Sequence, residues 1–231
     1  NYSEIIKARY KAEPYIKKFA FGDNNEILKN KKVLEIGVGA GSDFIGFLKR
    51  GAICYGIDAT QASINETRKN ISLALEENDY KLEFLEKVNA EKLPFDDNTF
   101  DLVYSHGVLH HAENTLSCIA EAIRVLKSRG KLKLMVYSTF SCTGLMLWGI
   151  HGLTKLKLFA SQEDLIFKYL ESPGTKCYSK KEFRKILTGF GMQNIKIDKH
   201  VNAGDLLFMP PSVKHNENPF YKIIQKIYPR F

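Results

Sequence analysis

Three closely spaced glycines near the N-terminus could bring backbone close to a ligand. Residues 33–43 read VLEIGVGAGSD, with Glu35 two positions before Gly37, followed by Gly39 and Gly41. An apolar strand that turns through glycines into a helix offers free N–H groups and the positive end of the helix dipole. The ligand classes that suit such a turn are a dinucleotide, a nucleotide phosphate and S-adenosylmethionine (SAM).

The glycine spacing argues against both phosphate-binding loops. A dinucleotide fingerprint places its third glycine three residues after the second, whereas Gly41 follows Gly39 by two. A P-loop ends in Gly-Lys-Ser/Thr, and this loop contains no lysine. The carboxylate of Glu35 would repel a pyrophosphate but attract the ammonium and sulfonium groups of SAM. The loop therefore favours SAM.

Alternating apolar and amphipathic segments predict the elements that position this loop. Strands are expected at residues 32–36, 53–57, 82–86, 100–105 and 131–137, with helices over 42–49, 61–77 and 113–126. Such an order specifies right-handed crossovers and a mainly parallel sheet, which is a doubly wound, Rossmann-like α/β fold. Ligands bind beyond the carboxyl ends of such strands, where Asp58, ending the second strand, could accept both ribose hydroxyls.

The flanking segments are expected to complete one domain over residues 1–231. Residues 1–29 would form a helical cover, with one helix over 3–21, and residues 30–137 the core. Residues 138–178 interrupt the alternation with the apolar run TGLMLWGI and a helix at about 162–170, and we interpret them as a helical insertion that caps the acceptor. Residues 179–231 would add the last helix, opened by a capping box at Ser179, an antiparallel edge from strands 193–198 and 206–209, and a basic tail.

Three motifs together resemble a known family. They are ExGxGxG after the first strand, the Asp that ends the second, and NAEKLPFDDNTFDLVYSHGVLHH at residues 89–111. The combination is similar to class I SAM-dependent methyltransferases, in the broad branch that resembles ubiquinone/menaquinone-biosynthesis methyltransferases (methyltransferase type 11-like). The similarity covers about residues 30–137. It implies SAM as the cofactor and methyl transfer as the activity.

The resemblance also implies which residues hold the cofactor. They are Glu35, Gly37, Val38, Gly39 and Gly41 at the methionine part, Asp58 at the ribose, Ala59 beside the adenine, Asn89, Ala90 and Glu91 along the adenine edge, and Ser105 and His106 beside the sulfonium. Many relatives have Asp at the position of Asn89, whose amide oxygen still accepts a hydrogen bond from the adenine amino group. The turn at residues 128–129 also departs from the usual Pro-Gly.

Catalysis by such an enzyme needs little more than placement, because a sulfonium is already an activated leaving group. The nucleophile must lie about 3–3.5 Å from the methyl carbon in a dry pocket. A base is needed for a hydroxyl acceptor, and His110 or, preferably, His111 could supply a neutral imidazole there. The alternative is that one of these histidines packs structurally and the other is exposed.

Contacts to the acceptor are expected from two further places. Tyr10, beside Arg9 on the N-terminal helix, could touch SAM or the acceptor, although it could equally be a core aromatic. Trp148 belongs to the apolar run of the insertion. This run is interpreted either as a lid for a lipid-like acceptor or as a segment that simply packs onto the sheet.

Composition restricts the class of protein. The chain has 231 residues, 44% of them apolar and 26% charged, as in an ordinary globular domain, and no apolar run approaches the roughly 18–20 residues of a membrane span. The four cysteines form no CxxC pair, which predicts buried thiols in a reducing compartment and no zinc site. No clustered Asp and His set indicates another metal. We expect a cytoplasmic protein, with peripheral membrane contact as a further option.

Charge leaves the acceptor open. Residues 140–231 contain 14 Lys or Arg and 7 Asp or Glu, so they carry most of the net charge of +8. This basic part could meet RNA, an anionic membrane or an acidic substrate, or be a solvated face. The expected function is in-line methyl transfer to an oxygen, nitrogen or carbon of a small-molecule, lipid-like or sugar-linked acceptor. The alternatives are an RNA (tRNA) methyltransferase and a non-enzymatic SAM-binding subunit. The sequence assigns no oligomeric state.

Overall fold

The computed structural model describes residues 2–22, 28–76, 79–153, 159, 161–170 and 174–200. The chain divides into two compact units. The first contains residues Asn1–Tyr10 and Pro14–Met135, and the second Lys11–Glu13 and Val136–Phe231. The single domain expected from the sequence stays a prediction.

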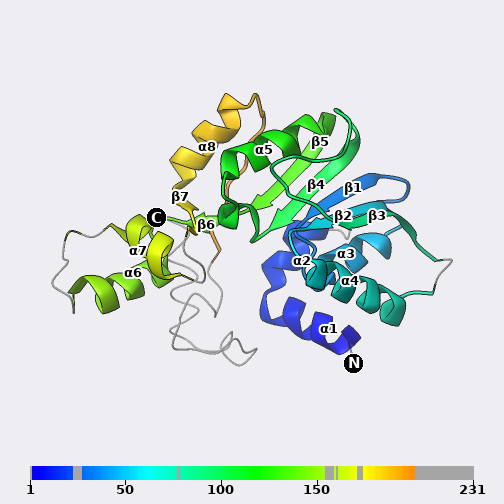
Figure 1. The fold of residues 1–231 in the computed structure, drawn as a ribbon, viewed down its shortest axis with the longest axis horizontal. Helices are drawn as coiled ribbons and strands as arrows, with labels where there is room; N and C mark the ends of the chain where they lie inside the picture. Colours follow the sequence, from blue (N-terminus) through cyan, green and yellow to red (C-terminus); the bar gives the residue numbers. More distant parts are fainter. Residues whose placement is uncertain are drawn as a thin grey trace. The chain divides into compact units, whose positions relative to one another are not determined.

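The first unit is built on a parallel sheet (Figure 1). Its strands are β1 (Lys32–Ile36), β2 (Ile53–Asp58), β3 (Lys81–Lys87), β4 (Phe100–His106) and β5 (Leu126–Met135). They lie in the order β3-β2-β1-β4-β5, and every neighbouring pair is parallel. The chain runs outward from β1 to β3 and then returns to β4, so the order reverses between β1 and β4. The doubly wound α/β prediction is confirmed, and a ligand is expected at this reversal.

Helices connect and cover these strands. They are α1 (Tyr2–Ala12), α2 (Pro14–Phe21), α3 (Ser42–Leu48), α4 (Gln61–Ala74), the 3-10 turn η1 (Leu109–His111) and α5 (Thr115–Arg124). The single helix expected over residues 3–21 is wrong, because the segment forms two helices. Pro14 lacks an N–H and disfavours the helical conformation at Glu13, so the first helix ends there.

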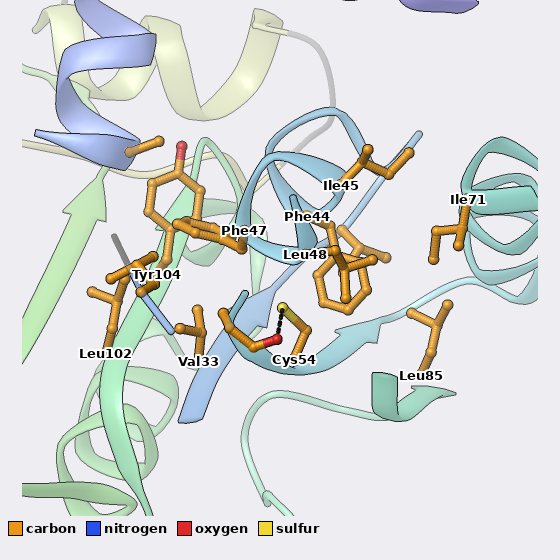
Figure 2. Packing of buried hydrophobic residues seen from close by; sticks show 14 of the residues in the cluster. Val33, Phe44, Ile45, Phe47, Leu48, Cys54, Ile71, Leu85, Leu102 and Tyr104 are labelled. Carbon is orange, nitrogen blue, oxygen red and sulfur yellow. Dashed lines mark hydrogen bonds between the residues drawn. The ribbon is translucent and has the colours of Figure 1, made fainter. Parts of the chain in front are cut away.

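One large hydrophobic cluster of the first unit lies between the sheet and helices α3 and α4. Figure 2 shows Phe44 and Phe47 of α3 packed above the strands, with Ile71 reaching in from α4. A Cβ at Gly46 would lie 2.3 Å from the ring of Phe21, so this glycine lets α2 approach α3 closely. Burying these rings stabilises the unit and fixes the start of α3, where the glycine loop ends.

The described residues of the second unit are mainly helical. It contains β6 (Tyr137–Ser138) paired in parallel with β7 (Cys177–Tyr178), α6 (Cys142–Leu147), the π-helix η2 (Trp148–Leu153), α7 (Gln162–Tyr169) and α8 (Lys180–Gly189). A small apolar cluster of Leu147, Leu165, Ile166 and Cys177 holds α6, α7 and β7 together. The capping box at Ser179 is confirmed: its Oγ accepts the Glu182 N–H at 3.1 Å, and the Glu182 carboxylate accepts the Ser179 N–H at 3.4 Å.

The edge of the sheet differs from the prediction. Strand β5 starts at Leu126 rather than at residue 131. Its pairing with β4 skips from Leu126 to Lys131, and Arg129 in this interval adopts a φ of +67°. Such a bulge lets the strand begin before an irregular turn. Residues 193–198 form no strand, and Ile195 instead accepts a hydrogen bond from Arg184 of α8. The other expected edge strand, at 206–209, and the basic tail lie outside the described residues.

Two further expectations concern buried thiols and membrane spans. Cys54, Cys118 and Cys177 are buried and take part in no disulfide, as the sequence predicts. Within the described segments, no helix combines the length and the apolar character that a membrane crossing needs.

Candidate functional site

A cavity of about 340 Å³ opens in the first unit where the strand order reverses. Its lining combines the loop after β1 and the start of α3 with Glu35 of β1, Asp58 of β2, His106 of β4 and Arg9 of α1. This volume is within the range of roughly 300–1,000 Å³ that small-molecule sites occupy. The cavity therefore lies at the place where the fold favours a ligand.

The glycines of the loop serve different purposes. Gly37, Gly39 and Gly41 have φ values of +84°, +53° and +78°, a region that side chains with a Cβ avoid. A Cβ at Gly37 would lie 2.3 Å from Val108, so this glycine is required for packing. A Cβ at Gly39 would meet nothing within 4 Å, although Gly39 lines the cavity. The backbone at Gly39 is thus the part of the loop that a ligand can approach most closely.

Side chains of neighbouring elements hold the loop in place. From α4, Thr67 donates a hydrogen bond to the Gly39 carbonyl at 2.8 Å, and Asn70 donates one to the Ala40 carbonyl at 3.0 Å. Asp58 accepts the Gly39 N–H at 3.1 Å and, with its other oxygen, the N–H and hydroxyl of Thr60 at 2.9 and 3.0 Å. The loop is preorganised by these contacts.

Glu35 carries a buried carboxyl group that lacks one of its hydrogen-bond partners. Its side chain lies in β1, and its Oε2 atom has no hydrogen-bond partner among the described residues. Burial raises the pKa of Glu35 well above its usual range, and the nearby negative charge of Asp43 raises it further. A buried carboxyl with a free oxygen favours a ligand that carries a positive charge or donates a hydrogen bond.

Asp43, in the first turn of α3, is the centre of a network that the sequence analysis missed. Its carboxylate accepts hydrogen bonds from both Nη atoms of Arg9 at 3.1 and 3.3 Å, from Tyr10 at 2.6 Å and from Tyr104 at 2.8 Å. The partners come from α1 and β4, far away in sequence. The only local signal is an acidic residue directly after the glycine loop. The Tyr10 hydroxyl, expected at the acceptor, is therefore engaged by Asp43.

His106 is the histidine that lines the cavity. Its Nε2 atom is buried and has no hydrogen-bond partner in the described part of the chain. Tyr104 stacks on its ring, with centroids 6.4 Å apart, and Tyr15 and Phe19 of α2 lie against it. Burial lowers the pKa of His106. The imidazole is therefore neutral at physiological pH.

The structure brings half of the expected cofactor residues together. Those that line the cavity are Glu35, Gly37, Val38, Gly39, Asp58 and His106. Gly41 packs beneath the loop, where an added Cβ would meet Thr67 at 2.9 Å. Ser105 is fully buried and donates to the Ile36 carbonyl at 2.9 Å, which ties β4 to β1. Its side chain is thus structural in this arrangement.

The expected adenine contacts lie outside the lining of this cavity, and so does Ala59. The Asn89 side chain accepts the Glu91 N–H at 2.9 Å, and Glu91 accepts the N–H of Asn114, the cap of α5, at 2.8 Å. Ala90 lies between them. These contacts brace the loop after β3 against the start of α5, and a role beside adenine stays a prediction.

The expected catalytic and acceptor residues are also placed elsewhere. His110 is fully buried in η1, His111 is half-buried, and their ring centroids are 4.2 Å apart. Neither histidine is part of the cavity lining. Trp148 belongs to the second unit, where it packs against the cluster around Leu147. The described residues contain no group of three or more His, Cys, Asp or Glu side chains placed to hold a metal ion.

Comparison with known proteins identifies relatives of this region. Residues 34–134 match the family model described as a methyltransferase domain. The chain is 33% identical over 104 residues to the uncharacterized methyltransferase YcgJ of Bacillus subtilis, which covers 45% of this chain and 40% of that protein. It is 27% identical over 173 residues to the ubiquinone biosynthesis O-methyltransferase of Pelagibacter ubique, covering 70% and 68%. The crystal structure of YcgJ matches with a TM-score of 0.57 at 18% identity, over 93% of this chain and 81% of that one.

The fold and the cavity define a doubly wound α/β protein with a small-molecule-sized cavity at its topological switch point. The family match is more specific: residues 34–134 are similar to a methyltransferase domain. The resemblance read from the sequence is thereby confirmed. The chain spans only 40% and 43% of the length of two of these curated relatives and 68% of a third.

Proposed function

We propose that this protein transfers the methyl group of SAM to a small-molecule acceptor by in-line displacement. The observation that carries the proposal is the charge of the cavity. Three carboxyl groups, those of Glu35, Asp43 and Asp58, line it against the single guanidinium of Arg9, so that Asp43 and Asp58 outnumber the positive charge even while Glu35 is uncharged. An excess of negative charge attracts a ligand with ammonium and sulfonium groups and repels a diphosphate.

The residues present fit SAM. The free Oε2 of Glu35 suits the ammonium of the methionine part, and the exposed backbone at Gly39 accommodates close approach. Asp58 already accepts three hydrogen bonds, and a carboxylate offers about four lone-pair sites, which leaves one site for a ribose hydroxyl. Bound SAM would supply a methyl group on positively charged sulfur, which needs no further activation.

The chain's own contribution is then to bind and orient the reactants and to exclude water. The loop is held rigidly by Thr67 and Asn70, and Asp43 fixes the start of α3 through its partners in α1 and β4. Placement of this kind lowers the barrier because the reactants no longer lose translational freedom at the transition state. The acceptor atom is an oxygen, nitrogen or carbon. Because one relative is named for O-methylation in ubiquinone biosynthesis, hydroxyl groups of quinone-type acceptors are the first class to test.

Binding of the demethylated cofactor tests the charge argument directly. Isothermal titration calorimetry should detect S-adenosylhomocysteine (SAH), which keeps the ammonium, and no NADH. Glu35→Gln should weaken SAH binding about tenfold, because an amide offers the ammonium no opposite charge. The matched control is Glu83→Gln, which changes an exposed glutamate of β3 and should leave the affinity unchanged.

The activity is tested with methyl-labelled SAM. A panel of phenolic hydroxyls, primary amines and acidic carbon compounds is incubated with the protein, and the labelled product is identified by mass spectrometry. Uptake of NADH with no binding of SAH or SAM would overturn the proposed function.

A further inference from the structure

We propose that His106 accepts the proton that a hydroxyl acceptor loses during methyl transfer. This inference rests on the proposed function and replaces His110 and His111 as the base. His106 ends β4 and lines the same cavity as Glu35 and Gly39, whereas neither of the other two histidines does. Proton transfer requires direct contact or one bridging water, so position in the cavity is the first criterion.

The ring of His106 offers a lone pair there. Its Nε2 atom is buried and has no hydrogen-bond partner among the described residues. A neutral imidazole carries its proton on one ring nitrogen and a lone pair on the other, and we assign the proton to Nδ1. Nε2 then carries the lone pair, as a base requires. A buried polar atom left without a partner calls for such an explanation.

The groups around His106 keep it neutral while the site is loaded. Tyr15 of α2 and Tyr104 of β4 contact its ring, and the titratable groups that line the cavity with it are Arg9, Glu35, Asp43 and Asp58. Burial lowers the pKa of His106, Asp43 raises it and Arg9 lowers it. Since Arg9 and Asp43 form an ion pair, their effects oppose each other and burial dominates. A neutral ring also avoids repulsion with a sulfonium.

In the proposed step, one bond forms, one bond breaks and one proton moves. The acceptor oxygen forms its bond to the methyl carbon, and the electron pair of the breaking C–S bond stays on sulfur, which becomes a neutral thioether. The hydroxyl proton moves to Nε2 of His106. The resulting imidazolium then releases this proton to solvent, which restores the neutral ring for the next turnover.

The first test follows the ring itself by NMR, using protein labelled with ¹⁵N-histidine and His106→Gln to assign its signals. The pKa of His106 is measured with SAH and with SAM, which differ by one positive charge at sulfur. If His106 faces the reacting centre, SAM should lower this pKa by about one unit relative to SAH. Equal values in the two complexes would overturn the proposal. Failure of both ligands to bind would instead contradict the proposed function.

The second test separates a base from a merely structural ring. His106→Gln should bind SAH within about threefold of the original protein, yet lose at least about 100-fold in kcat on the phenol that the acceptor panel identifies. Its residual rate should rise steadily with pH as the phenol ionises, whereas the original protein reaches a plateau.

The matched control is His200→Gln, since His200 is exposed in the second unit. Unchanged turnover in His106→Gln would contradict the proposal, and so would a panel in which only amines or carbon acids are methylated.

Discussion

Replacement of Asp43 by asparagine should strongly destabilise the first unit. The carboxylate is buried and accepts four hydrogen bonds, from Arg9, Tyr10 and Tyr104. An asparagine keeps the shape but loses the charge and turns one acceptor into a donor. The Arg9 guanidinium would then lack its counter-ion, and one tyrosine hydroxyl would face an N–H group.

The magnitude follows from these partners. Hydrogen bonds to a charged group contribute about 1.5–3 kcal/mol each, and removal of one partner from a buried ion pair costs about 3–5 kcal/mol. The Arg9 side chain is 29% exposed, so water compensates for part of its loss. We therefore expect the free energy of unfolding to fall by about 3–4 kcal/mol. Tyr104→Phe, which removes one hydrogen bond and leaves the ion pair, should cost about 1.5–2 kcal/mol.

Urea unfolding followed by circular dichroism measures both values. The control is Asp79→Asn, because Asp79 is exposed and should change stability by less than about 0.5 kcal/mol. A loss in Asp43→Asn no larger than that of this control would refute the network as a stabilising feature. SAH should restore part of the lost stability only if the cavity still forms.

Three further predictions concern the loop and the strands beneath it. Gly37→Ala should prevent stable folding, because its Cβ would overlap Val108. Gly39→Ala should lower the free energy of unfolding in urea by about 1 kcal/mol, but it should weaken SAH binding, measured by calorimetry, at least about tenfold. Because its folded pKa is raised, Glu35 should contribute stability that is full below about pH 4.5 and is lost as pH rises through the folded value. Urea titrations across this range should show that dependence disappear in Glu35→Gln. Ser105→Ala should lower the free energy of unfolding by about 1 kcal/mol with SAH affinity unchanged, and an affinity loss above tenfold would show that its hydroxyl contacts the cofactor.

Cofactor binding should also release protons. If the ammonium of SAM contacts Glu35, the carboxyl must ionise on binding, because a positive neighbour favours its charged form. Calorimetric titrations at one pH in buffers of different ionisation enthalpy count these protons. No dependence on the buffer would contradict an uncharged Glu35 in the ligand-free protein.

Local patterns in the sequence determined the scaffold and the loop. Strands β1, β2 and β4 are short segments rich in apolar residues, and the crossover helices have the period of amphipathic helices, so these elements could be predicted without knowledge of distant residues. The glycine spacing, Glu35 and Asp58 were found for the same reason, because the loop and the ends of β1 and β2 are set by neighbouring residues. A proline visible in the sequence, Pro14, explains the divided N-terminal helix, although periodicity alone suggested a continuous one.

Only the tertiary structure decided which side chains share the cavity. Asp43 meets Tyr104 across 61 positions and Arg9 across 34, and no local period encodes such contacts. The sequence did not show which of the histidines between residues 106 and 111 lines the cavity. In the structure, the end of β4 places His106 at the cavity, while η1 places His110 in the interior. Residues 193–198 likewise alternate like a strand, but a strand forms only where a neighbouring edge offers its hydrogen bonds. Long-range packing decides these outcomes because it sets burial and partners, which the chain's local chemistry leaves open.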